Sequence, residues 1–203
     1  MFVRVFENPV SPHASRSRGY EQRSYEIHPL EGGRYQLKIW GRLPRCWADH
    51  LCRGLARNGL GIVQGFARHG AEAEWIGSFE LERTRRGVDP MLVDFLALAL
   101  RPPSDVAPPP IAIEHYTIEV AADGALDLEL IGPDQLGFLG GLLERLSFLS
   151  LVPDEMKVET GPGGIHDRFR LRMRDGGAPG VATARILAEI LDGRLCTGVA
   201  AAG

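Results

Sequence analysis

Residues suited to binding a small molecule are concentrated in one short loop, Gly132 to Phe138, which links a strand to an apolar helix. Asp134 stands where its side chain can cap the first amides of that helix. The N-terminus of a helix has unpaired amides and a partial positive charge, which suits a carboxylate. Gly137 lets a ligand approach the backbone, and Asp134 can accept from an amino group, although capping alone explains Asp134 equally well. We predict a ligand-binding site formed by Gly132, Asp134, Gln135, Leu136, Gly137 and Phe138.

Other residue types that could do chemistry do not form a recognisable site in the sequence. Cys46 and His50 are four residues apart on one expected helix and could share a metal ion, but Cys52 points to a different side and no fourth ligand follows. His69 and His166 lie near turns without a spaced Ser, Cys or Asp partner. The chain also lacks a phosphate-binding Gly-Lys-Ser sequence and a Gly-x-Ser-x-Gly elbow. We therefore expect no catalytic residues, no metal ion and no cofactor.

The elements that would position the loop follow from the spacing of apolar residues. Leucines alternate with acidic residues over 126–130, as in a strand with one buried face. Four leucines between Leu139 and Leu146 then recur at helical spacing, so this helix should lie on the inner face of a sheet. Two further strands, at about 154–160 and 165–173, are joined by a Gly-Pro-Gly-Gly turn. The expected order is strand, helix, strand, strand.

This order and the loop sequence together resemble an ACT domain, a small βαββαβ regulatory module in which a sequence like Asp-Arg-Pro-Gly-Leu-Leu links the first strand to the first helix. The matching stretch is GPDQLGFLGGLLERLSFLSLVPDEMKVETGPGGIHDRFRLR. Residues 134–139 keep the Asp, the Gly and the two apolar positions, and have Gln135-Leu136 in place of Arg-Pro. The resemblance implies that this loop binds a free amino acid, often between two domains packed side by side.

The first half of the chain repeats the second half at an offset of 91 residues, which falls slightly after later turns. Each copy therefore reads as strand, strand, helix, strand, strand, helix. The loop at 41–47, equivalent to the predicted site, lacks both the Asp and the Gly, so we expect the first copy to pair with the second and not to bind the same ligand. Matched positions include Tyr25 with Tyr116, Tyr35 with Leu126, Trp47 with Phe138, Leu51 with Leu142 and Leu55 with Leu146.

Changes in composition predict the domain organisation. Residues 1–22 form a polar N-terminal arm, 23–100 the first ACT-like repeat, 101–110 a linker in which five of ten residues are proline, and 111–203 the second ACT-like repeat. The predicted fold class is α+β. We expect two ferredoxin-like sandwiches, of βαββαβ or permuted ββαββα order, each with an antiparallel four-stranded sheet and two helices on one face. The strand at 114–121 either pairs at the edge of the second repeat or closes the first.

Composition and charge also bear on the class of partner. A formal net charge of -3 and an isoelectric point near 6.1 give no reason to expect nucleic acid or membrane as a partner. An outward row is formed by Arg168, Arg170, Arg172 and Arg174, but Asp127 and Glu129 face outward on the neighbouring strand, so we predict cross-strand ion pairs. Three cysteines do not make a disulfide framework, and no apolar run of about 18 residues is present, so we expect a cytoplasmic location.

Three hypotheses about function remain open. The first is a non-enzymatic regulator that senses an amino acid or similar small metabolite, resembling the two-domain regulators related to the glycine cleavage system repressor. It would form a homodimer and signal to a protein partner that the sequence does not identify. The second is an assembly module that binds no ligand. The third is a small hydrolase resembling acylphosphatases, which needs an Arg and an Asn at a phosphate, and the asparagines of the chain are Asn8 and Asn58.

Overall fold

The structure, a computed structural model, describes residues 23–70, 74–101 and 111–193. The expected N-terminal arm, 1–22, and nearly all of the expected linker, 102–110, lie outside the described residues. The elements of the first half are β1 (Ser24–Pro29), η1 (Glu31–Gly33), β2 (Arg34–Gly41), α1 (Trp47–Arg57), β3 (Leu60–His69), β4 (Trp75–Arg83), η2 (Pro90–Leu92) and α2 (Phe95–Leu100). Those of the second half are β5 (His115–Val120), β6 (Leu126–Gly132), α3 (Phe138–Phe148), β7 (Leu151–Gly161), β8 (Gly164–Met173) and α4 (Val181–Leu191).

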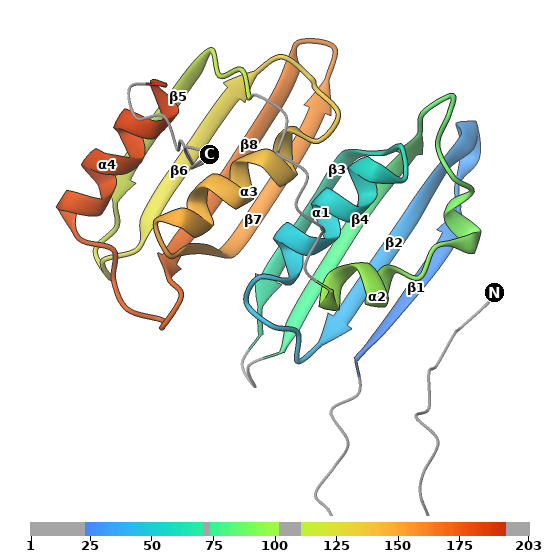
Figure 1. Cartoon of the computed structure of the whole chain (residues 1–203), viewed down its shortest axis with the longest axis horizontal. Coiled ribbons are helices and arrows are strands. Elements are labelled where there is room, and N and C mark those ends of the chain that lie inside the picture. Colours follow the sequence, from blue (N-terminus) through green and yellow to red (C-terminus); the bar gives the residue numbers. More distant parts are fainter. Residues whose placement is uncertain (1–22, 71–73, 102–110, 194–203) are drawn as a thin grey trace, which may run out of the picture.

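All eight described strands belong to one antiparallel sheet, in the order β1-β2-β4-β3-β7-β8-β6-β5 (Figure 1). The prediction of two separate ferredoxin-like sandwiches, each with its own four-stranded sheet, was therefore wrong. Strands β3 and β7 join the two halves, with Gly65 opposite Val158 and Phe66 opposite Lys157. Two separate sheets would have left these strands as edges with unpaired backbone donors and acceptors. Alternation of side chains identifies a strand but not its neighbour, so the sequence pattern did not reveal this junction.

The junction has approximate two-fold symmetry. Phe66 and Lys157 are equivalent positions of the 91-residue repeat, and they face each other across β3 and β7. Arg53 of α1 and Glu144 of α3 are equivalent as well, and the Arg53 Nη1 atom lies 2.8 Å from Glu144 Oε1. Equivalent elements therefore meet at the centre of the sheet, as they do in an isologous dimer, although both belong to one chain.

Strands β1 and β5 form the outer edges of the sheet. Strand β5 pairs with β6, so that Tyr116 lies opposite Leu130 and Ile118 opposite Leu128. The strand predicted at 114–121 thus belongs to the second half and does not close the first. Each half places its first strand at an outer edge and its third strand at the central junction.

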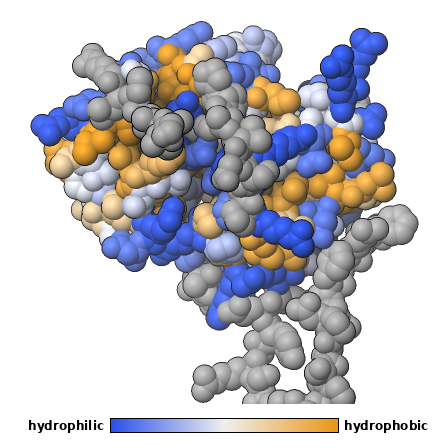
Figure 2. Space-filling model, viewed as in Figure 1, coloured by the Kyte–Doolittle hydropathy of each residue, from blue (hydrophilic) through white to orange (hydrophobic). Residues whose placement is uncertain are grey.

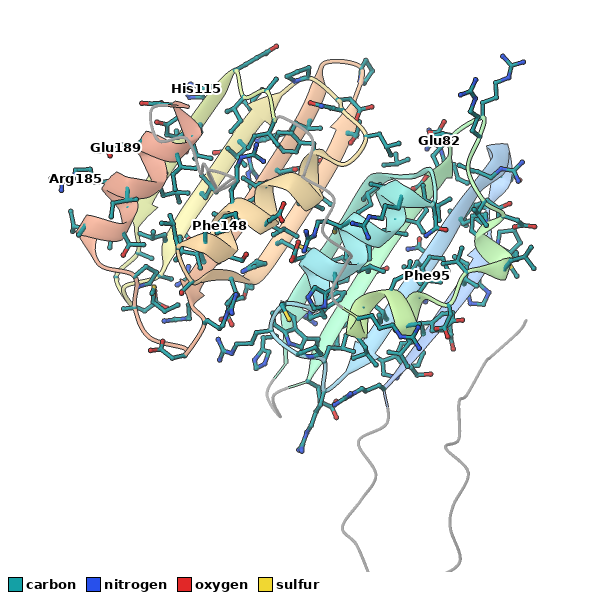
Figure 3. All side chains as sticks on the ribbon, viewed as in Figure 1. Glu82, Phe95, His115, Phe148, Arg185 and Glu189 are labelled. Carbon is teal, nitrogen blue, oxygen red and sulfur yellow. The ribbon has the colours of Figure 1, made fainter. Side chains whose placement is uncertain are left out.

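The helices lie on one face of the sheet, with α1 and α3 over its centre and α2 and α4 outside them (Figure 1). Helix α2 lies close to α1 because Gly54 has no side chain, and a Cβ there would lie 2.9 Å from Leu98 Cδ2. Phe95 of α2 packs against Tyr25, with ring centroids 5.5 Å apart (Figure 3). The core between helices and sheet includes the fully buried side chains of Leu37, Trp47, Phe79, Phe95, Leu126 and Leu128.

Hydrophobic residues are visible on the helix-covered face over α4 and around η2 (Figure 2). The most exposed of them are Leu92 and Val181, each 75% exposed. Single apolar side chains of this kind are common on protein surfaces and mark no site by themselves. None of the described helices has the length and apolar composition needed to cross a bilayer.

Candidate functional site

A cavity of about 310 Å³ lies at the junction of the two halves, at the N-terminal end of α3. Helix α1, strands β3, β7 and β8, and the loop before α3 form its walls. Arg34 and Glu82, which are both exposed, line its rim, and Figure 3 shows Glu82 at the end of β4. The volume is at the lower end of the range for small-molecule sites, about 300–1,000 Å³, so there is room for one small ligand. Aliphatic side chains on the walls include Leu55, Leu60, Ile62, Val158 and Ile165.

The predicted loop residues are mostly brought together at this cavity. Gly132 does not line it, because this residue ends β6, where a Cβ would lie 2.7 Å from the Ala112 carbonyl oxygen. Its small size therefore serves a close backbone contact away from the cavity. That the other five contact a ligand stays a prediction. The five predicted residues that line the cavity are Asp134, Gln135, Leu136, Gly137 and Phe138.

Asp134 does not cap α3, so this part of the prediction was wrong. The helix begins at Phe138 and its N-cap residue is Gly137, with φ 87° and ψ 0°, and no side chain makes a capping hydrogen bond. A turn closed by the Phe138 amide on the Gln135 carbonyl, at 2.9 Å, separates Asp134 from the helix. Residues with a side chain rarely adopt the left-handed conformation of Gly137. Gly137 is thus required by the backbone, in addition to leaving room for a ligand.

The first amides of α3 remain unpaired at the cavity. The Gly141 amide donates to the Gly137 carbonyl at 2.9 Å, whereas the amides of Leu139 and Gly140 donate to no described residue. Unpaired amides at a helix N-terminus, together with the positive end of the helix dipole, form a position that favours an anion. Leu139 and Gly140 both line the cavity, so this position borders it.

A buried carboxyl on β8 lies at the same cavity, and the sequence analysis missed it. Asp167 is 3% exposed, and its Oδ1 accepts a hydrogen bond from the Glu159 amide at 3.2 Å. Its Oδ2 accepts no hydrogen bond from a described residue, and Asp167 lines the cavity. Burial raises the pKa of Asp167 to about 7, although the Glu159 amide and His166 act in the opposite direction.

The strand pattern contained a signal for Asp167. The arginines of β8 are predicted to face outward, so the alternation puts Phe169 and Leu171 inward, and both are buried. Side chains two residues apart share a face of a strand, so the same alternation puts Asp167 and Ile165 inward. A carboxyl on an apolar inner face is unusual enough to indicate a binding role.

An ion cluster between α1 and α3 fixes the two helices beside the cavity. The Arg53 Nε atom lies 3.0 Å from Asp49 Oδ1, and its Nη1 atom lies 2.8 Å from Glu144 Oε1. Gly140 allows this close approach, since a Cβ there would lie 2.7 Å from Arg53 Cγ. Burial raises the pKa of Asp49, and the charge of Arg53 opposes that rise. The cluster ties the two halves together across the junction.

Among the described residues, the other candidate groups do not assemble into a catalytic or metal site. Cys52 is buried and lines the cavity, and burial raises its pKa, so it is a thiol and a poor nucleophile. Asn58 Nδ2 donates to the Gly54 carbonyl at 2.8 Å, so this asparagine is engaged at the end of α1 and not at a phosphate site. No three His, Cys, Asp or Glu side chains of the described chain lie close enough to share a metal ion.

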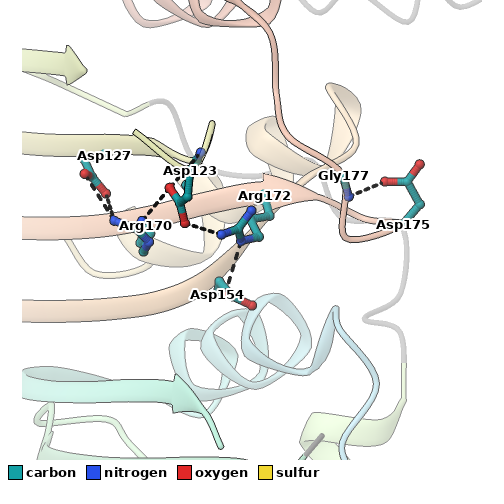
Figure 4. A network of polar contacts seen from close by, with 8 residues as sticks. Asp123, Asp127, Asp154, Arg170, Arg172, Asp175 and Gly177 are labelled. Carbon is teal, nitrogen blue, oxygen red and sulfur yellow. Dashed lines mark hydrogen bonds and ion pairs between the residues drawn. The ribbon is translucent and has the colours of Figure 1, made fainter. Parts of the chain in front are cut away.

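Three of the four arginines of the predicted row form ion pairs on the open face of the sheet. Arg168 Nε lies 2.9 Å from Glu129 Oε1, and Arg170 Nη2 lies 2.6 Å from Asp123 Oδ1. Asp123 also contacts Arg172, so one carboxylate links two arginines (Figure 4). Hydrogen bonding from Arg170 holds the pKa of Asp123 below its ordinary value. The row is therefore a ladder of ion pairs, an ordinary arrangement for a solvated sheet face.

The cavity thus brings together unpaired helix amides, one buried carboxyl and aliphatic walls. Each of these can hold a different part of one small molecule. Searches of protein-family models, of curated proteins and of solved structures found no match to this chain. What the cavity binds must therefore be inferred from the chemistry of its own walls.

Proposed function

We propose that this protein is a non-enzymatic regulator that binds a free amino acid in the cavity at the N-terminus of α3. One observation carries the proposal: Leu139 and Gly140, with unpaired amides, and the buried Asp167, with one unpaired oxygen, line the same cavity of about 310 Å³. An anion-binding position and a cation-binding position in so small a space match the carboxylate and ammonium groups of one amino acid.

The placement of the cavity supports a regulatory role. Its walls come from both halves of the chain, with Leu55 and Leu60 from the first half and Val158 and Ile165 from the second. A ligand held there would contact both sides of the junction, so binding would favour one arrangement of the two halves over others. The resemblance of residues 134–139 to the ACT loop implies the same class of ligand. We place the protein in the cytoplasm, as a homodimer that signals through protein contacts.

The test is a thermal-shift screen of the full-length protein against the twenty amino acids, followed by isothermal titration. A ligand at about 100 times its Kd should add about 2.7 kcal/mol to the free energy of unfolding. Ala56 lines the cavity from α1 and is partly exposed, so Ala56→Trp should occupy the space and remove the shift without unfolding the protein. Ser147 is the equivalent residue of α3, away from this cavity, and Ser147→Trp should leave the ligand shift intact.

The same screen also tests the second hypothesis, that the protein is an assembly module without a ligand. If no amino acid shifts the melting temperature of the wild-type protein, the amino-acid-binding proposal fails. An assembly module that binds no ligand then becomes the better account, and the oligomeric state measured by analytical ultracentrifugation would be the quantity of interest.

A further inference from the structure

We infer, resting on the proposed function, that Asp167 selects ligands with an ammonium group beside their carboxylate, and that the aliphatic walls restrict the ligand to amino acids with uncharged, apolar side chains. Asp167 is a buried carboxyl at the cavity for which the described residues offer only one hydrogen-bond donor. A carboxyl that is 3% exposed and accepts one hydrogen bond from the protein leaves its second oxygen unsatisfied. Burying such a group is costly unless a partner is supplied. An ammonium group supplies both the charge and the missing hydrogen bond.

The first half of the chain shows that this strand position does not need a carboxyl for folding. With the offset of 90 that holds after the turn, Asp167 is equivalent to Gly77 of β4. There the space is occupied by Trp47, since a Cβ on Gly77 would lie 2.9 Å from Trp47 Cη2. The same fold therefore forms with no side chain at this position. Among the described residues Asp167 accepts a bond from the Glu159 amide and none from the α3 amides, so Oδ2 and those amides are left for a ligand.

The walls and the charge at the cavity argue against charged side chains on the ligand. An acidic side chain would meet Asp167 inside and the carboxylates of Glu82 and Asp134 at the rim. Among the described residues that line the cavity, Arg34 is the one basic side chain. A basic side chain that reached inward would lose its hydration among aliphatic groups without a second buried carboxylate. An aliphatic side chain fits walls that include Leu60, Ile62, Val158 and Ile165, and its burial adds to affinity.

The experiment compares ligands and variants by isothermal titration at about pH 8. The probes are L-leucine, L-isoleucine, L-valine and L-methionine, with L-aspartate and L-lysine as charged counterparts. Each apolar probe is also tested as its 2-oxo acid, which keeps the carboxylate and lacks the ammonium group. We expect the tightest ligand to be apolar and its 2-oxo acid to bind at least about tenfold more weakly, because one charge-assisted hydrogen bond is lost.

Asp167→Asn tests the residue directly, because asparagine keeps the size and the acceptor for the Glu159 amide. It should lower the affinity for the apolar amino acid at least about tenfold. It should not lower the affinity for the 2-oxo acid, because that anion no longer meets a buried carboxylate. Glu155→Gln is the matched control, since it neutralises an exposed carboxylate on the other face of the sheet, away from the cavity. This control should bind the amino acid as the wild type does.

The pH dependence of affinity gives a second readout, which a change in the shape of the residue 167 side chain alone would not alter. Burial raises the pKa of Asp167, so an ammonium ligand must displace a proton at low pH, and affinity should rise from about pH 6 to pH 8. Asp167→Asn should remove this rise. His166 lies on the face of β8 opposite to Asp167. His115 of β5 lies on that same face, on the other side of β6 from His166. The other titratable groups that line the cavity are Arg34, Cys52, Glu82 and Asp134.

The outcomes separate this inference from the proposed function. If an amino acid binds but Asp167→Asn or the 2-oxo acid binds equally well, the role of Asp167 is overturned and the proposed function stands. If the tightest amino acid is charged, the restriction to apolar side chains is overturned. If none of the amino acids binds the wild-type protein, the proposed function fails and the inference fails with it. The ligand comparison needs no variant, so it holds even if Asp167→Asn does not fold.

Discussion

Equivalent places in the two halves hold cavities of very different volume. The cavity at the N-terminus of α3 measures about 310 Å³, and the one at the N-terminus of α1 measures about 10 Å³. Gly137 and Gly140 line the cavity beside α3. By the 91-residue repeat they are equivalent to Cys46 and Asp49, which line the cavity beside α1. Side chains at two positions that are glycine in the second half therefore fill the corresponding space in the first.

A second difference lies beneath the helices. Trp47 of α1 is fully buried and covers Gly77, whereas its equivalent in α3 is the smaller Phe138, and Asp167 takes the place of Gly77. One half has an indole ring over this strand position, and the other has a carboxyl that lines the open cavity. An approximate two-fold junction offers two symmetric places for a ligand, and side-chain volume decides which of them can hold one.

The largest effect should come from removing the buried charge that distinguishes the open cavity. The pKa of Asp167 is about 7 in the folded protein against an ordinary value of 3.8, which corresponds to about 4 kcal/mol. Between these values the folded protein holds a proton that the unfolded chain has released, so this group's contribution to stability falls as pH rises and stays low above pH 7. Asp167→Asn should therefore be more stable than the wild type at about pH 8, by up to about 4 kcal/mol, and equally stable at about pH 3.

Urea unfolding at the two pH values measures this difference. Glu155→Gln, on the solvated face of the sheet, serves as the control and should show no comparable gain. An equal difference between Asp167→Asn and wild type at both pH values would show that the effect is one of packing and not of charge.

Placing the residue of the closed cavity into the open one should give the next largest effect. A Cβ on Gly140 would lie 2.7 Å from Arg53 Cγ and 3.1 Å from the Arg53 backbone nitrogen, so Gly140→Asp must push α1 and α3 apart. Overpacking of this kind costs about 1–3 kcal/mol. Urea unfolding should show the loss, and calorimetry should show no ligand binding. Gly161→Asp, where nothing lies within 4 Å of an added Cβ, should cost little, and an equal loss there would contradict the explanation.

The N-cap residues of α3 and α1 should respond differently to substitution by alanine. Gly137 has φ 87°, whereas Cys46, the N-cap of α1, has φ -90°. Gly137→Ala forces a side chain into the left-handed region and should cost about 1–2 kcal/mol. Cys46→Ala introduces no backbone strain and should cost less. Thermal unfolding of both variants tests this, and similar losses would mean that the left-handed turn before α3 is not required.

The smallest effect should appear at the other ends of the same helices. Ser150, after α3, has φ 57°, and its equivalent after α1 is Gly59, with φ 67°. Ser150→Gly should raise the free energy of unfolding by about 0.5–1 kcal/mol, since strain is removed at some cost in chain entropy. Gly59→Ser should be destabilising, because a Cβ there would lie 2.7 Å from Gly87 Cα. Urea unfolding measures both, and a loss of stability in Ser150→Gly would reverse the explanation.

The sequence by itself determined the local elements and their repetition. Alternation over 126–130 and helical spacing from Leu139 to Leu146 predicted β6 and α3, and the offset of 91 predicted the matching elements of the first half. These patterns are readable because the backbone sets the periods of 2 and about 3.6 residues locally. Five of the six residues predicted around Gly137 also line one cavity, since adjacent residues of a short loop must stay close in space.

Only the tertiary structure decided what surrounds that loop. The pairing of β3 with β7 joined two expected sheets into one. Backbone hydrogen bonds between strands are the same for all side chains, so the sequence does not show which strands pair. The turn before α3 left Asp134 at the rim and gave Gly137 the cap position, while Asp167, thirty-three residues after Asp134, came to the same cavity from β8. The volume of that cavity depends on how Phe138 and Gly140 pack against α1, and packing between segments distant in sequence is set by the whole chain.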